Sequence, residues 1–95
     1  MSMYACRLMD LSSGHSCHPP QMALQASTDV LINSRGAHRQ GDMWQTHCCG
    51  NDCHFGTLTI GSTTVLVNGK GLGRIGDAIT CGSIVMTGST DVLAG

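Results

Sequence analysis

The chain has 95 residues, a formal net charge of −1, and one residue each of Phe, Tyr and Trp. A chain of this size forms one small domain whose modest core needs a metal, disulfides or a partner to stabilise it. Its Lys and Arg residues are scattered singly, which excludes the basic face of a nucleic-acid-binding protein. No stretch approaches the ~20 apolar residues of a transmembrane helix, and the N-terminus lacks a signal peptide's apolar run, so we expect cytosolic synthesis.

Strands are predicted in place of helices, because 13 glycines break every window long enough for helical periodicity. Taken in chain order, an irregular N-terminus over about 1–8 is followed by strands at 28–33, 63–68 and 90–94. Each strand follows a Ser and repeats the pattern of a Thr, a Val-Leu pair and further small or apolar residues. A single domain over 1–95 is expected, with repeat units at about 9–42, 62–77 and 88–95.

The repeat extends beyond the strands. A shift of 35 residues superimposes the strand, an Asn-led turn, an Arg and a Gly-Asp turn of the first unit on those of the second. Asn68-Gly69 favours a tight hairpin turn. Three unequal copies predict a monomer with approximate three-fold symmetry. Such a monomer matches a homotrimeric partner, although a duplication within an isolated β domain gives the same pattern.

The apolar alternation within the strands divides their side chains into two sets. Val30, Ile32, Val65, Val67 and Val92 form one set, and Leu31, Leu66 and Leu93 form the other. One set packs into the core while the other is free to meet a partner. The pattern alone leaves open which set does which.

Six Cys and five His supply the chemistry of the chain. Cys48, Cys49 and Cys53 are close enough in sequence for a local metal site or a disulfide. The open pairings are Cys48–Cys53, Cys49–Cys53 and a bridge that reaches Cys17. Cys6 is expected to pair with nothing, His38 to be an exposed strand residue, and Trp44 to pack in the core.

Several of these motifs resemble those of the PAAR-repeat family, over Met9 to Gly95. They are Gly-His-Ser-Cys-His-Pro-Pro at 14–20, the two segments 30–42 and 65–77, Ile-Thr-Cys-Gly-Ser at 79–83, and Gly-Ser-Thr-Asp-Val-Leu at 88–93. The Pro-Ala-Ala-Arg sequence that names the family is replaced by Gly-Ala-His-Arg at 36–39 and Gly-Leu-Gly-Arg at 71–74. Residues 9–10 read Met-Asp where Gly-Asp is usual.

The resemblance implies an all-β, pseudo-three-fold cone of β-hairpins with a metal at its apex. Family members bind zinc through three His and one Cys, which places the ligands at His15, His47, His54 and Cys81. His18 is the rival of His15, which is preferred because it follows Gly as in the family pattern. Four nitrogen and sulfur ligands complete a structural zinc shell with no open position, and iron is a weaker candidate.

The resemblance also implies a function as a spike tip. The protein would be made in the bacterial cytoplasm and would cap, as one copy per trimer, a homotrimeric β-helical spike that is VgrG-like or a phage central spike. It would sharpen a phage tail or type VI secretion needle, touch the target membrane transiently and not form homo-oligomers. Catalysis is not expected, because the chain has no Glu and its metal would have no open site. The alternative is a free-standing zinc-binding module or adaptor without a spike partner.

Overall fold

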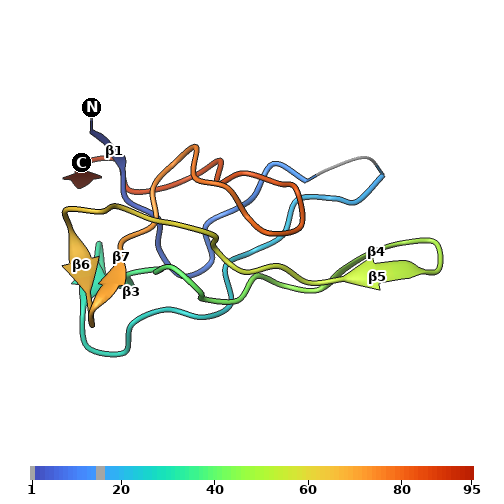
Figure 1. The fold of residues 1–95 in the computed structure, drawn as a ribbon, viewed down its shortest axis with the longest axis horizontal. Coiled ribbons are helices and arrows are strands. Elements are labelled where there is room, and N and C mark those ends of the chain that lie inside the picture. The colour runs from blue at the N-terminus through green and yellow to red at the C-terminus, as the bar shows by residue number, and fades with distance from the viewer. Residues whose placement is uncertain (1, 15–16) are drawn as a thin grey trace.

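The computed structural model describes residues 2–14 and 17–95 of a tapered molecule with extents of 38 × 26 × 21 Å. One end is broad and carries most of the strands, and the other narrows to a single hairpin (Figure 1). No helix occurs in the described residues, so none of them forms a helix that could cross a membrane. The predicted all-β cone is confirmed.

Within residues 2–14 and 17–95, eight short strands form four antiparallel pairs. The strands are β1 (Met3–Tyr4), β2 (Leu31–Ile32), β3 (Arg35–Gly36), β4 (His47–Cys49), β5 (Asp52–His54), β6 (Leu66–Val67), β7 (Lys70–Gly71) and β8 (Leu93–Ala94). The pairs are β1 with β8, β2 with β3, β4 with β5, and β6 with β7. Three pairs lie at the broad end, and β4–β5 extends toward the narrow end (Figure 1).

Tight turns connect the strands of the two sequential hairpins at the broad end. Asn68 and Gly69 have φ angles of 53° and 78°, and Asn33 and Ser34 have 53° and 67°. Two consecutive residues of positive φ are typical of the turn that matches the twist of a β-hairpin. The hairpin turn predicted at Asn68-Gly69 is confirmed, and the structure repeats it one unit earlier.

The third pair at the broad end joins the two ends of the sequence. Met3 pairs with Ala94 and Tyr4 with Leu93, as Leu31 pairs with Gly36 and Leu66 with Gly71. Residues 3–8, for which the sequence predicts an irregular terminus, therefore supply the second strand of the third repeat unit.

A closed ring of backbone hydrogen bonds marks the pseudo-three-fold axis. The N–H of Cys6 donates to the carbonyl of Gly73, that of Gly73 to His38, and that of His38 to Cys6, over 2.8–3.0 Å. One residue comes from each repeat, two positions after β1, β3 or β7. The predicted three-fold arrangement is therefore present in the backbone.

An arginine follows each ring residue and forms an ion pair with the aspartate three residues later. The pairs are Arg7–Asp10, Arg39–Asp42 and Arg74–Asp77, with N–O distances of 2.8–3.0 Å. In each pair the aspartate also accepts a hydrogen bond from the backbone N–H of its own arginine. The pairs close the turn that follows the ring and direct the chain toward the narrow end.

The core consists of two apolar layers. The broad-end layer contains small and aliphatic residues, namely Ala5, Ile32, Ala37, Val67, Leu72 and Ala94. The middle layer contains Cys6, Ala23, Trp44, Leu58, Ile79 and Val85. Trp44 is 1% exposed, so its predicted place in the core is confirmed. Trp44 is the largest fully buried side chain of the described residues.

At the broad end the leucine set faces outward, and the other set is divided. Ile32 and Val67 are buried and Val92 is half-buried, but Val30 and Val65 are each 37% exposed. Leu31, Leu66 and Leu93 are 60%, 59% and 53% exposed. The three leucines occupy equivalent strand positions. Nearly equal exposure at three related positions makes a symmetric apolar triplet, which we call the leucine triplet.

Candidate metal centre

Three excursions of the chain leave the middle layer toward the narrow end. We call them the first arm (residues 11–14 and 17–22), the second arm (43–57) and the third arm (78–84). Each arm is closed at its base by an equivalent backbone hydrogen bond. The donors and acceptors are Ser12 N–H to the Gln21 carbonyl, Trp44 N–H to the Gly56 carbonyl, and Ile79 N–H to the Ser83 carbonyl. The arms differ in length, so their tips bring different chemistry to one end of the molecule.

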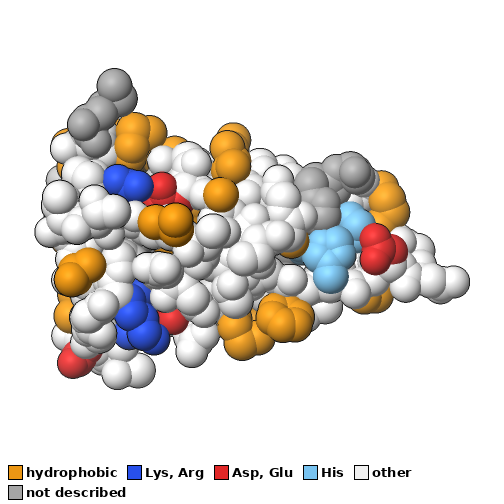
Figure 2. Space-filling model, in the orientation of Figure 1, with side chains coloured by type: hydrophobic (Ala, Val, Ile, Leu, Met, Phe, Trp, Pro, Cys, Tyr) orange, Lys and Arg blue, Asp and Glu red, His pale blue; other side chains and the backbone are white. Residues whose placement is uncertain are grey.

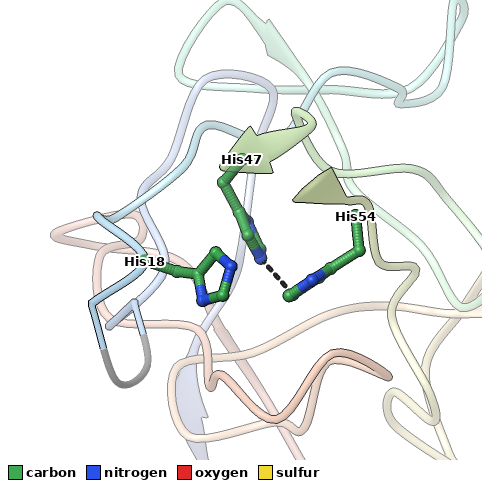
Figure 3. A group of neighbouring side chains, drawn as sticks. All are labelled: His18, His47 and His54. Atoms are coloured by element: carbon green, nitrogen blue, oxygen red, sulfur yellow. Dashed lines mark hydrogen bonds between the residues drawn. The ribbon is translucent and has the colours of Figure 1, made fainter. Parts of the chain in front are cut away.

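The second arm contributes a pair of histidines. In the β4–β5 hairpin His47 lies directly opposite His54, and their Nε2 atoms are 2.6 Å apart (Figure 3). One imidazole donates its proton and the other accepts it. His47 is 4% exposed and His54 is half-buried. The cross-strand register therefore places two nitrogen ligands side by side.

His18 of the first arm completes a group of three. Its ring centroid lies 4.9 Å from that of His47 and 4.4 Å from that of His54. Its Nε2 lies 3.1 Å from the carbonyl oxygen of Asp52 and 3.5 Å from a carboxylate oxygen of the same residue. The three histidines each offer a ligand atom, and these atoms all lie within 4.8 Å of one another.

This donor set fits a divalent transition metal. Neutral imidazole nitrogens are ligands of zinc, copper, iron and nickel. Three of them meet toward the narrow end, where Figure 2 shows that part of the histidine surface is visible. His18 and His47 are buried, which limits access of water to one side of the group. The residues present could therefore hold an ion that joins the first arm to the second.

Cys81 lies on the turn of the third arm, outside the three-histidine group. Gly82 after it has a φ of 103°, which a residue with a side chain rarely adopts. A Cβ placed on Gly56 would lie 3.1 Å from the Cys81 Sγ, so the thiol faces the backbone of the second arm, two residues beyond His54. Cys81 is a free, half-buried thiol.

The predicted ligand set is brought together in part. The structure places His47 and His54 in one group, and it places His18 there as the third member. His15 lies outside the described residues. The sequence offered His18, between Cys17 and Pro19-Pro20, as the rival ligand. His15 was preferred because it follows Gly as in the family pattern.

The apical cysteines form two disulfides, Cys17–Cys49 and Cys48–Cys53. The Cys48–Cys53 bridge was among the predicted pairings. The Cys17–Cys49 bridge corresponds to the predicted alternative of a bridge that reaches Cys17. Cys6 is free, as predicted, but it is fully buried on the axis. Burial in the core raises the pKa of the Cys6 thiol, so this sulfur stays protonated and inert at neutral pH.

His38 corrects one expectation. The sequence predicts an exposed strand residue, but His38 is 0% exposed because the backbone ring draws its position to the axis. Its Nδ1 lies 2.7 Å from the carbonyl oxygen of Gln25, and its ring meets Trp44 edge-on. Burial lowers the pKa of His38, so the ring is neutral and belongs to the core.

Comparison with known proteins identifies the family. The model of the PAAR motif family matches residues 13–93. The chain belongs to the PAAR motif family. The predicted resemblance is thereby confirmed.

Two relatives come from strains of Pseudomonas aeruginosa. They are the NAD(P)(+) glycohydrolase toxin Tse6 and the (p)ppApp synthetase toxin Tas1, each 35% identical to this PAAR chain over 78 residues. Each alignment covers 76% of this chain and 18% of the toxin. The chain thus corresponds to less than a fifth of either relative.

Proposed function

We propose that this PAAR protein caps a homotrimeric β-helical spike of a contractile injection machine and sharpens it for entry into a target envelope. The observation that carries the proposal is the leucine triplet at the broad end. A closed trimer presents three identical edges, and a monomer can engage all of them only if its own surface repeats three times. Leu31, Leu66 and Leu93 supply such a repeat, because they occupy equivalent positions of three strand pairs.

The distribution of charge supports the proposed orientation. Every charged side chain except that of Asp52 belongs to residues 7–10, 29–42, 70–77 or 91, which include the ion pairs below the arms. Figure 2 shows the Lys and Arg side chains of this face gathered toward the broad end. Charged groups are costly to bring into a bilayer, so arms with a single charge suit the leading end.

The two relatives favour a secretion needle over a phage tail as the machine. Both relatives are named as toxins. A toxin needs a machine that delivers it, so a segment shared with two toxins favours a secretion needle. The alignments cover 18% of each toxin, so they give no support for assigning either enzymatic activity to this chain. The proposed role is structural, with no catalysis.

A metal would strengthen the leading end. We propose one zinc ion held by His18, His47 and His54, with Cys81 as the fourth ligand from the third arm. Three imidazoles and a thiolate give the closed tetrahedral set of a structural zinc, which supplies folding energy and no reactive position. The ion would join all three arms.

The test of the cap is binding to a purified homotrimeric β-helical spike. We expect one chain per trimer by light scattering. Leu31→Asp, Leu66→Asp and Leu93→Asp should each weaken binding at least tenfold, because each buries a charge in the interface. Phe55→Asp is the matched control, since Phe55 is 55% exposed but lies beside His54 on the second arm. Stable wild-type monomers that bind zinc but no spike would favour the free-standing module.

A further inference from the structure

We propose that oxidation of Cys17 and Cys49 clamps the first arm onto the second and thereby holds His18 in place for metal binding. This inference adds a redox dependence to the metal centre and rests on the zinc site proposed above. The clamp is distinct from the second disulfide, because the two bridges lie on opposite faces of the β4–β5 hairpin.

The register of the hairpin separates the two bridges. His47, Cys48 and Cys49 pair with His54, Cys53 and Asp52 in turn. Successive side chains of a strand point to opposite faces, so His47 and Cys49 share one face while Cys48 lies on the other. The histidine face is buried at His47, whereas Cys48 and Cys53 are both exposed.

The Cys17-His18 dipeptide of the first arm contacts the histidine face. Cys17 bonds to Cys49, with their Cα atoms 5.7 Å apart. The neighbouring His18 reaches the carbonyl oxygen of Asp52, the residue paired with Cys49, over 3.1 Å. The disulfide and the His18 contacts therefore join the same two segments.

The three histidines do not depend equally on this bridge. His47 and His54 are aligned by strand pairing within one arm, and their positions need no other segment. His18 comes from a separate arm, 29 residues before His47. A disulfide that fixes the first arm on the second before the ion binds reduces the conformational entropy that metal binding would otherwise lose. The bridge therefore preorganises the one ligand that the hairpin cannot position.

The Cys48–Cys53 disulfide makes a natural control. It joins residues that already face each other across the strand pair, five positions apart in sequence. Neither cysteine belongs to the first arm, and both lie on the face opposite to His47. Breaking this bridge should loosen the hairpin without releasing His18.

The bridge forms by thiol–disulfide exchange with a small-molecule disulfide. The Cys17 thiolate, on the exposed side, attacks one sulfur of the oxidant and releases its other half as a thiol. The Cys49 thiolate then attacks the Cys17 sulfur and displaces the second half. Two protein thiols are oxidised, one small disulfide is reduced to two thiols, and the two thiol protons pass to solvent or to the released thiolates. A reducing cytosol leaves the clamp open, and an oxidising compartment closes it.

The experiment compares zinc affinity, by chelator competition, in protein equilibrated with glutathione disulfide or with a reductant. Oxidised wild type should bind zinc about tenfold or more tightly than reduced wild type, a difference of about 1.4 kcal/mol. The paired variant Cys48→Ser with Cys53→Ser should keep this dependence. The paired variant Cys17→Ser with Cys49→Ser should lose it and bind like reduced wild type. Equal affinity in both redox states of the wild type would overturn the clamp.

Two further outcomes are decisive. If Cys17→Ser with Cys49→Ser binds zinc far more weakly than reduced wild type, these thiols are metal ligands and the clamp is wrong. Hydrogen exchange in metal-free protein decides the matter without zinc: reduction should speed exchange of first-arm amides in wild type and in Cys48→Ser with Cys53→Ser. No change would overturn the proposal. Spike binding, which depends on the leucine triplet, is measured separately and can fail or succeed independently.

Discussion

Met9 occupies a backbone position that its two counterparts fill with glycine. Its φ is 70°, and Gly41 and Gly76, one residue before the aspartates of the second and third ion pairs, have 84° and 94°. A left-handed conformation costs a residue with a Cβ about 1–2 kcal/mol. The turn between Arg7 and Asp10 therefore carries local strain that the two equivalent turns avoid.

Replacing Met9 with Gly should stabilise the protein. Relief of the left-handed strain exceeds the entropy that glycine adds to the unfolded chain, so we expect a gain of about 0.5–1 kcal/mol in the free energy of unfolding. The Met9 side chain is 52% exposed, so little core packing is lost. Denaturant unfolding of metal-free protein measures the change.

Gly41→Ala and Gly76→Ala are the matched controls for Met9→Gly. A Cβ at either glycine meets no atom within 4 Å, so the substitution adds strain without a steric clash. Both should lower the free energy of unfolding by about 1 kcal/mol. A stabilising effect of either alanine would show that the turn tolerates a side chain and would remove the reason for the Met9 prediction.

At the scale of the elements, series of side-chain hydrogen bonds link neighbouring units around the broad end. Arg7 donates to the side-chain oxygen of Asn33 over 3.0 Å, and the amide nitrogen of Asn33 donates to Asp91 over 2.9 Å. The next chain runs in the same way from Arg39 through Asn68 to Asp29. These bonds lower the pKa values of Asp91 and Asp29, with the asparagine as the largest cause.

The third contact between neighbouring units, around Gly95, uses different groups. Gly95 stands where the other units have asparagine, and the hydroxyls of Ser62 and Thr64 donate to its carbonyl oxygen. Thr64 itself replaces the aspartate of the other strands. In this unit the Arg74 guanidinium donates to both carboxylate oxygens of Asp77. Two coordinated replacements therefore preserve contact between units while changing its chemistry.

The ion pairs should differ in their contribution to stability. The Asp42 side chain is 1% exposed and that of Asp77 is 12% exposed. Asp42→Asn leaves a buried Arg39 without its charge partner and should cost roughly 3 kcal/mol, whereas Asp77→Asn should cost roughly 1–2 kcal/mol. Denaturant unfolding gives both values. An equal cost for the two variants would show that burial of the pair does not set its contribution.

The elements were predictable where local sequence determines them. Three strands, the Asn68-Gly69 turn and the buried Trp44 follow from residue type and spacing. Residues 3–8 were not recognised as a repeat strand. Of the shared Gly, Arg, Gly and Asp positions, this part of the sequence keeps Arg7 and, beyond the segment, Asp10. His38 was assigned to the surface because sequence spacing does not reveal a backbone ring that forms only in the folded chain.

The metal centre was predictable in part for a related reason. His47 and His54 were chosen from the family resemblance, and the structure sets them opposite each other across the β4–β5 hairpin. The choice between His15 and His18 depends on how the first arm meets the second, which is a tertiary contact. The cysteine pairing likewise required knowledge of which face of β4 each sulfur occupies.

For the whole molecule, metal content is the decisive property of the narrow end. Elemental analysis of purified protein should find about one zinc per chain, and His18→Ala, His47→Ala, His54→Ala and Cys81→Ala should each weaken binding at least tenfold, because each opens the tetrahedral shell. His15→Ala should retain the ion. Loss of zinc in His15→Ala but not in His18→Ala would restore the ligand set expected from the family pattern.

The pairing of β1 with β8 also constrains how the chain folds. Met3 and Ala94 meet across nearly the full sequence, and the axial ring needs Cys6 together with segments around His38 and Gly73. Contacts so distant in sequence demand large loop-closure entropy and slow the folding of β proteins. The hairpins at β2–β3 and β6–β7 can form during synthesis, but the cone closes only when its last strand is available. Assembly of the base is therefore a late event, governed by the longest loop in the molecule.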